Sequence, residues 1–177
     1  FFFKQKTAYE IVDCDWSSDV CSSDLVDDLR LVIDSLEPID HDLLTLLASL
    51  RHRLGGRLER AGLAMDWEVQ DLPPLPWLQP PDALQVLRIM QEVMSNVLRH
   101  AGARRIRVVT RALPTQVEVE VADDGCGFDA QQPSTGRGLR HLVQRAGRLG
   151  GSVQIDSAAG RGTRVTLVLP LERAAPL

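Results

Sequence analysis

The residues best suited to chemistry lie in one stretch, Gln91–His100. Glu92, Asn96 and His100 follow one another at intervals of four, which places a carboxylate, an amide and an imidazole on one stripe of a helix. Arg99 lies beside them. Together such groups can exchange a proton, coordinate a cation or bind an anion. A plain solvent-facing helix surface would show the same pattern, so the downstream sequence has to decide.

Three glycine-rich segments follow this stretch. They are Asp123-Asp124-Gly125-Cys126-Gly127-Phe128, then Gly136-Arg137-Gly138-Leu139, then Gly160-Arg161-Gly162-Thr163. Each segment alone is a weak signal, because turns use glycine for purely conformational reasons. Their order and spacing after a Glu-x-x-x-Asn helix is the informative feature.

Taken together, these segments resemble the ATP-binding domain shared by sensor histidine kinases, type II topoisomerases, Hsp90 chaperones and MutL-type repair proteins. The resemblance covers roughly Leu43–Leu171. It implies an α+β two-layer sandwich of the Bergerat type, with a mixed, mostly antiparallel sheet and helices packed on one face. It also implies ATP as the substrate and Mg²⁺ as the cofactor.

The resemblance assigns the adenine end of the site to the first glycine segment. Asp123 would accept a hydrogen bond from the adenine amino group, and a wrong base would leave that carboxylate unpaired at a cost. Gly125 and Gly127 would let the backbone approach the base and bend the loop. Thr163 would complete the pocket, although a simple turn threonine fits equally well. Phe128 is expected in the core rather than against the ligand.

The same resemblance assigns the phosphate end to the helix. Asn96 would coordinate Mg²⁺ through its amide oxygen, alongside phosphate oxygens and water. Glu92, one turn earlier, would act as the polarising base. Arg99 and His100 would neutralise phosphate charge, with a merely solvated Arg99 as the alternative.

The second glycine segment is assigned to the lid of the site. Gly136 and Gly138 would hinge a short lid over the phosphates. They would also offer backbone amides from the start of the following helix.

The flanking sequence resembles one subfamily, the sensor histidine kinases partnered with NarL/LuxR-type response regulators. Asp28–Pro38 is similar to the end of their dimerisation and phosphotransfer helix pair, and Leu87–Glu92 and Gly138–Leu142 also match. The resemblance implies transfer of the ATP γ-phosphate to a histidine and then to a regulator aspartate. It implies a homodimer through the helix pair and a cytoplasmic domain, and leaves open whether the intact protein is anchored in the inner membrane.

The phosphoacceptor histidine of that subfamily should lie upstream of Asp28, where this chain has none. His41 precedes an aspartate but follows Pro38 and directly abuts the catalytic domain, so we do not expect it to be the acceptor. His52 and His141 are expected to be surface or packing residues. The chain should therefore bind ATP without phosphorylating itself in cis. An anti-sigma-factor-type serine kinase and a non-catalytic, nucleotide-gated interaction module remain as alternatives.

Hydrophobic spacing predicts the elements that position these residues. The central helix should span Asp82–Ala103, with Asp82 as N-cap after Pro80-Pro81. A preceding helix should run from an Asp40 cap to about Ala61, with leucines inside. The remaining predicted elements are a helix tail at 26–36, strands at 65–69, 106–108, 117–121, 153–155 and 164–169, and a helix at 139–149. That order predicts a mostly antiparallel sheet with helices on one face.

Composition changes abruptly near Leu25. Both lysines, the only tyrosine and three of the four phenylalanines precede it, whereas 18 arginines and no lysine follow. Lys4–Ile11 and Asp15–Leu25 resemble the translated arms of a synthetic sequencing-library adaptor, with Val12-Asp13-Cys14 as a variable index between them. We therefore divide the chain into a foreign segment (1–25), the helix-pair end (26–38), the catalytic domain (39–172) and a tail (173–177).

Charge and cysteine content narrow the function classes. The chain has a net charge of −4, and about −1 remains once the first 25 residues are set aside. This balance argues against a nucleic-acid binder, which needs a basic excess. Without Cys14 and Cys21 only Cys126 remains, so neither a disulfide framework nor a zinc site is expected.

Overall fold

The computed structural model describes residues 41–128 and 137–173. The predicted helix tail at 26–36, the adaptor-like segment and Gly136 lie outside these residues. Five strands form one sheet in the order β1-β2-β3-β5-β4, in which β1 and β2 are parallel and all other neighbours are antiparallel. The strands are β1 (Ala64–Glu68), β2 (Arg105–Ala112), β3 (Gln116–Asp123), β4 (Ser152–Ser157) and β5 (Thr163–Pro170).

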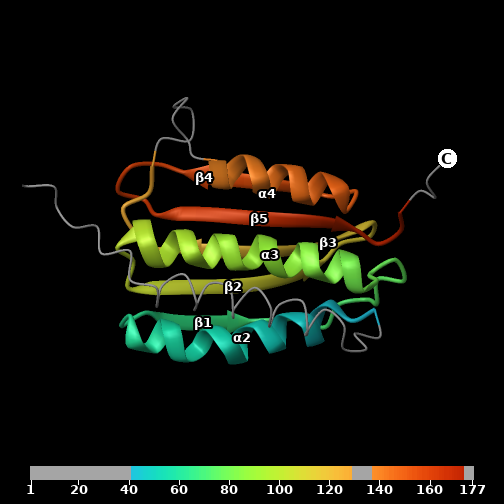
Figure 1. Ribbon diagram of the computed structural model, residues 1–177, viewed down its shortest axis with the longest axis horizontal. Coiled ribbons are helices and arrows are strands. Elements are labelled where there is room, and N and C mark those ends of the chain that lie inside the picture. The colour runs from blue at the N-terminus through green and yellow to red at the C-terminus, as the bar shows by residue number, and fades with distance from the viewer. Residues whose placement is uncertain (1–40, 129–136, 174–177) are drawn as a thin grey trace, which may run out of the picture.

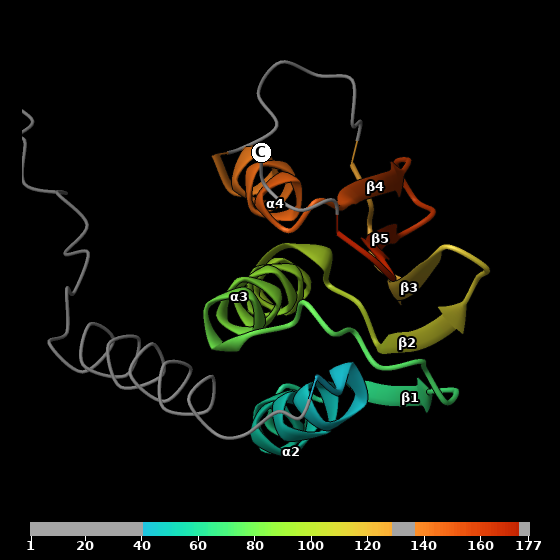
Figure 2. The ribbon, with the colours of Figure 1, turned by 90° about the vertical axis from the view of Figure 1, so that its right-hand side faces the viewer.

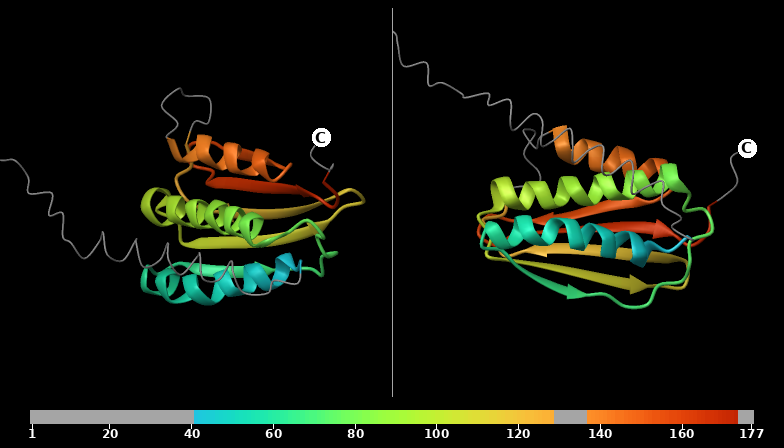
Figure 3. Two further views of the ribbon diagram at one scale, coloured as in Figure 1. Left: turned by 45° about the vertical axis from the view of Figure 1, so that its right-hand side comes forward. Right: turned by 60° about the horizontal axis from the view of Figure 1, so that its bottom comes forward.

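Three α-helices cover one face of this sheet, as the edge-on view in Figure 2 shows. They are α2 (Leu43–Arg60), α3 (Pro80–Asn96) and α4 (Arg137–Arg148). In Figure 1 α3 lies over the middle of the sheet, with α2 on the β1 side and α4 on the β4 side. The predicted two-layer α+β architecture is confirmed, and Figure 3 shows the same layering from two further directions.

The core lies between the two layers. On α2 six leucines are buried, the same six that the spacing places inside: Leu43, Leu46, Leu47, Leu50, Leu54 and Leu58. They belong to one hydrophobic cluster that also contains the buried side chains of α3 and inward-facing residues of β2, β3 and β5. Among the described residues no helix combines the length and the apolar character needed to cross a bilayer.

The N-termini of two helices differ from the predictions. For α2 the cap is Asp42, whose carboxylate accepts from the Leu44 amide at 2.8 Å, and not Asp40. For α3 the cap is Gln79, and Pro80-Pro81 form the first turn rather than precede it. Proline suits that position because its missing N–H would have no helical partner there. Asp82 was therefore wrongly predicted as a cap.

Asp82 instead takes part in a group of contacts at the N-terminal end of α3. Its carboxylate accepts from Arg173 at 2.9 Å, and the Arg173 guanidinium lies 4.8 Å from the ring centre of Trp77. The Trp77 indole N–H donates to the carbonyl of Pro170 at 2.8 Å. These contacts join the end of β5 to the start of α3, well away from the glycine segments.

The C-terminal end of the central helix also departs from the prediction. The α-helix ends at Asn96, and Val97–Ala101 wind as a π-helix that Gly102 terminates in the left-handed region (φ 57°). A π-turn has more residues per turn, so the four-residue spacing does not carry the helical stripe from Asn96 to His100. Such turns are frequent at functional sites.

Candidate ATP-binding site

A cavity of about 520 Å³ opens between the C-terminal half of α3 and the sheet. Eight of the ten predicted site residues line it: Glu92, Asn96, Arg99, His100, Asp123, Gly127, Gly138 and Thr163. Gly125 lies next to the cavity in the loop after β3, and Gly136 falls outside the described residues. Segments that lie far apart in the sequence, from Glu92 to Thr163, thus meet around one space.

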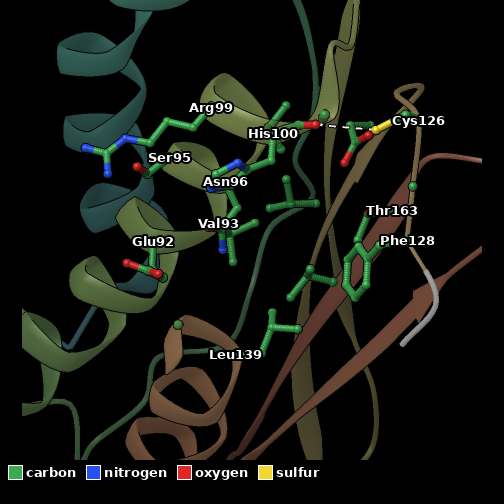
Figure 4. Close-up of a pocket in the computed structure, with 17 residues that line it drawn as sticks. Glu92, Val93, Ser95, Asn96, Arg99, His100, Cys126, Phe128, Leu139 and Thr163 are labelled. Atoms are coloured by element: carbon green, nitrogen blue, oxygen red, sulfur yellow. Dashed lines mark hydrogen bonds between the residues drawn. The ribbon is translucent and has the colours of Figure 1, made fainter. Parts of the chain in front are cut away.

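One wall of the cavity is the α3 helix and its π-turn. In Figure 4 Glu92, Ser95, Asn96 and Arg99 line up along this wall, and the Arg99 guanidinium extends away from the opposite wall. Arg99 and His100 are exposed. Among the side chains that the structure describes (41–128 and 138–173), no hydrogen bond or ion pair fixes those of this helix wall.

The opposite, sheet wall is formed by the end of β3, its following loop and the start of β5. Asp123 ends β3 and is paired with Thr163 in the register of β3 and β5. Its carboxylate Oδ1 accepts from the Gly125 amide at 2.9 Å. Burial raises the pKa of Asp123 above its ordinary value, while hydrogen bonds from the backbone amides of Gly125 and Thr163 act in the opposite direction. A partly desolvated carboxylate with fixed geometry is suited to reading a hydrogen-bond donor.

Thr163 is held by a hydroxyl that sequence reasoning missed, that of Ser157 at the end of β4. Ser157 Oγ accepts from the Phe128 amide at 2.9 Å and lies 3.1 Å from the Gly162 carbonyl, to which it donates. Since a serine hydroxyl has one proton, the 3.0 Å contact with Thr163 must use the Thr163 proton. Thr163 Oγ1 therefore offers only acceptor capacity to the cavity. No pattern in the sequence marks Ser157.

The glycines after β3 have structural reasons in addition to the expected one. A Cβ on Gly125 would overlap the backbone carbonyl of Ala101, and one on Gly127 (φ 60°) would overlap that of Ala158. The Cys126 amide donates to the Ala101 carbonyl at 2.8 Å, and its thiol donates to the His100 carbonyl at 3.3 Å. The loop is thus fastened to the π-turn, and its glycines permit this close approach.

Apolar side chains complete the cavity. Val93 contributes from α3, Val121 and Val165 from the sheet, and Leu139 from the first turn of α4. Phe128 is half-buried and also lines the cavity, so its expected place in the core was wrong. The strand valines could not be distinguished in the sequence from other core residues, because alternation marks only which face they occupy.

Residues 81–173, just over half of the chain, match the family described as "Histidine kinase-, DNA gyrase B-, and HSP90-like ATPase". The chain belongs to this family. Membership makes it an ATP-binding domain, and the observed sheet with helices on one face agrees with that assignment.

Two curated relatives of this ATPase domain are described as kinases. Sensor histidine kinase LiaS of Bacillus subtilis (strain 168) is 26% identical over 145 residues, which cover 81% of this chain and 39% of that protein. An uncharacterized sensor-like histidine kinase of Chloroflexus aurantiacus is 36% identical over 94 residues, covering 49% of this chain and 16% of that protein. The chain therefore spans less than half the length of these relatives.

A solved structure supports the fold independently. The blue-light activated histidine kinase of Erythrobacter litoralis EL346 superposes with a TM-score of 0.67 at 23% identity, covering 87% of this chain and 50% of that one.

Proposed function

We propose that this chain is the ATP-binding catalytic part of a two-component sensor histidine kinase. The observation that carries the proposal is the cavity, which has Asp123 on the sheet wall and Glu92 and Asn96 on the helix wall. Its volume of about 520 Å³ falls in the range of small-molecule sites. The matching kinases among the relatives support the reaction class.

At the sheet wall, adenine would lie against Val121 and Val165. Asp123 would accept from the exocyclic amino group, and Thr163 Oγ1 would serve as a second acceptor. Both adenine recognition points are acceptors, and guanine carries a carbonyl where adenine carries that amino group. With the base in this orientation, guanine would place its carbonyl oxygen against the Asp123 carboxylate, so the pairing favours adenine.

At the helix wall, Asn96 would hold Mg²⁺ together with phosphate oxygens. The described residues contain no cluster of three or more His, Cys, Asp or Glu side chains able to hold a metal ion. An ion held by one amide oxygen, phosphates and water fits the donors present, since Mg²⁺ in nucleotide sites usually has few protein ligands. When bound, the ion would neutralise charge on the phosphates.

Glu92 would act as the general base for phosphoryl transfer. An imidazole nitrogen of the acceptor histidine attacks the γ-phosphorus, the bond from phosphorus to the β–γ bridging oxygen breaks, and ADP leaves with the electron pair. Glu92 takes the proton that the imidazole loses. Arg99 and His100 would counter the phosphate charge from the mouth of the cavity, with Gly138 at the start of α4 on the γ side.

The acceptor and the partners belong to the intact protein. We infer that the acceptor histidine lies in a helix pair upstream of Asp28, that this pair forms a homodimer, and that a NarL/LuxR-type regulator receives the phosphoryl group. Residues 1–25 would be an adaptor-derived replacement of that upstream segment, so the chain would not phosphorylate itself in cis. The domain would act in the cytoplasm, with the parent protein a candidate for the inner membrane.

Transfer in trans tests this proposal. The chain is mixed with γ-labelled ATP and a separately prepared histidine-bearing helix pair of a NarL/LuxR-partnered kinase. We expect an acid-labile, base-stable phosphohistidine on the helix pair, and Glu92→Gln should lower the rate by about 100-fold or more while leaving ATP affinity within about twofold. An acid-stable phosphoserine on any substrate would favour the serine-kinase alternative. ATP binding without transfer, indifferent to Glu92→Gln, would favour an interaction module.

A further inference from the structure

Gly138, the second residue of α4, faces the carboxylate of Glu92 on α3. A Cβ built on Gly138 would overlap Glu92 Oε1, and would lie 3.4 Å from its Cδ and 3.9 Å from its Cγ. The tip of the proposed base thus occupies the space that any other residue at position 138 would fill. This constraint differs from the hinge role that the sequence suggests for Gly138.

Little else fixes the Glu92 carboxylate. Glu92 is half-buried, and the side chains that the structure describes, those of 41–128 and 138–173, include no hydrogen-bond or ion-pair partner for it. The first turn of α4 carries backbone amides without helical partners and the positive end of the helix dipole, both of which attract a carboxylate. The close approach to Gly138 is therefore the contact through which α4 limits where the base lies.

A second glycine in α4 provides a matched comparison. Gly147 belongs to the same helix, and a Cβ built on it meets no atom within 4 Å. Alanine is favoured over glycine at helical positions, so alanine should be tolerated at both sites as far as the helix is concerned. Of the two alanine substitutions, only the one at position 138 would place a methyl group against Glu92.

We propose that Gly138 is a positioning residue for Glu92: the absence of a side chain at position 138 lets the carboxylate dock on the first turn of α4, from where it serves the acceptor. The proposal rests on the proposed function for the role of Glu92. The docking itself is a geometric claim that holds or fails without ATP.

The expected consequence is displacement of the base without loss of the fold. The atom that a new Cβ would meet is the far end of a flexible side chain, which can rotate away at small cost. Gly138→Ala should therefore leave the melting temperature nearly unchanged. The phosphotransfer rate should fall, because a general base acts only within hydrogen-bond reach of its proton.

Nuclear magnetic resonance tests the docking on the intact chain without nucleotide. The backbone amide signal of residue 138 should move as Glu92 titrates in the wild type, and this movement should vanish in Glu92→Gln. In Gly138→Ala this movement of the amide signal should shrink to less than half of its wild-type size, whereas in Gly147→Ala it should keep its wild-type size. An amide signal that ignores Glu92 in the wild type, or that responds equally in Gly138→Ala, would overturn the proposal while leaving ATP binding untouched.

Kinetics provide the functional arm. In the trans assay at saturating ATP, Gly138→Ala should lower the phosphotransfer rate by about tenfold or more, and Gly147→Ala should leave that rate unchanged. Equal rates for the two alanine variants would overturn the positioning role. If the wild type binds no ATP although the amide of residue 138 follows Glu92, the proposed function fails and the docking stands, so the two failures are distinguishable.

Discussion

The two walls of the cavity are built in opposite ways. On the sheet wall Asp123 and Thr163 are fixed by hydrogen bonds, from Gly125 at 2.9 Å and to Ser157 at 3.0 Å. On the helix wall the side chains of Asn96 and His100 have no such bonds to the described residues. A fixed acceptor discriminates between ligands, because a mismatch leaves it unpaired, whereas free side chains can follow charge that moves during a reaction. The sheet wall is thus suited to selecting the base and the helix wall to chemistry on the phosphates.

The largest loss of stability in the sheet wall should come from substituting a glycine that packs directly against the backbone of Asp123. Gly162 and Gly160 both have positive φ, 72° and 76°, but only a Cβ on Gly162 would overlap backbone, the Asp123 carbonyl. Gly160→Ala should lower the unfolding free energy by about 1–2 kcal/mol, the cost of left-handed backbone. Gly162→Ala should lower it by about 3 kcal/mol or more because strands must separate. Urea unfolding of both variants measures the difference, and equal losses would contradict the rigid sheet wall.

The next largest effect is expected at the acceptor for adenine. Asp123→Asn should weaken ATP binding by roughly 10–100-fold, since a hydrogen bond to a charged group is lost. The adjacent Asp124→Asn is the control, because Asp124 is exposed and its carboxylate accepts from the amides of Arg104 and Arg105 instead. Isothermal titration calorimetry measures both affinities. The distinction between the walls fails if the two variants lose affinity alike.

On the helix wall the expected effect is conditional on the metal ion. Asn96→Ala should reduce ATP affinity in Mg²⁺ to the level seen in a chelator, by roughly tenfold, and should leave the metal-free affinity unchanged. Titrations with and without Mg²⁺ provide the test. If Asn96→Ala weakens metal-free binding just as much, the residue serves the fold or the nucleotide directly.

The smallest effect concerns pH. Because burial raises the pKa of Asp123 above 3.8, its protonation should weaken ATP binding at a pH higher than an exposed aspartate would require. Because the pKa of Asp123 is higher in the folded chain than in the unfolded one, folding favours the protonated carboxyl. The free energy of unfolding therefore gains a contribution that is fully present below pH 3.8 and is lost as the pH rises through the pKa of Asp123 in the folded chain. Asp123→Asn should remove both dependences. Affinity and melting temperature measured against pH would show this, and an Asn variant with an unchanged pH profile would contradict it.

Much of this arrangement could be predicted from the sequence, because it depends on local patterns. Six of the seven leucines of α2 recur at helical spacing and are buried. The hairpin of β2 and β3 turns at Pro114-Thr115, where proline interrupts two alternating runs. Glu92 and Asn96 share a helix face because that part of α3 is a regular α-helix.

Other features depend on contacts between distant segments, which no local pattern records. The π-turn after Asn96 accompanies the fastening of Ala101 to Cys126, 25 positions away. Ser157 becomes part of the site only because β4 and β5 pair beside the loop at Phe128. Pro80-Pro81 could be assigned to either side of the helix boundary, and Gln79 supplies no side-chain cap that would have marked it.

The most direct test of the account is a titration of the intact chain with ATP and GTP in the presence of Mg²⁺. We predict that ATP binds and that GTP binds at least 100-fold more weakly, because Asp123 accepts from the adenine amino group and meets only a carbonyl on guanine. Equal affinities, or no binding of ATP, would contradict the assignment of this cavity.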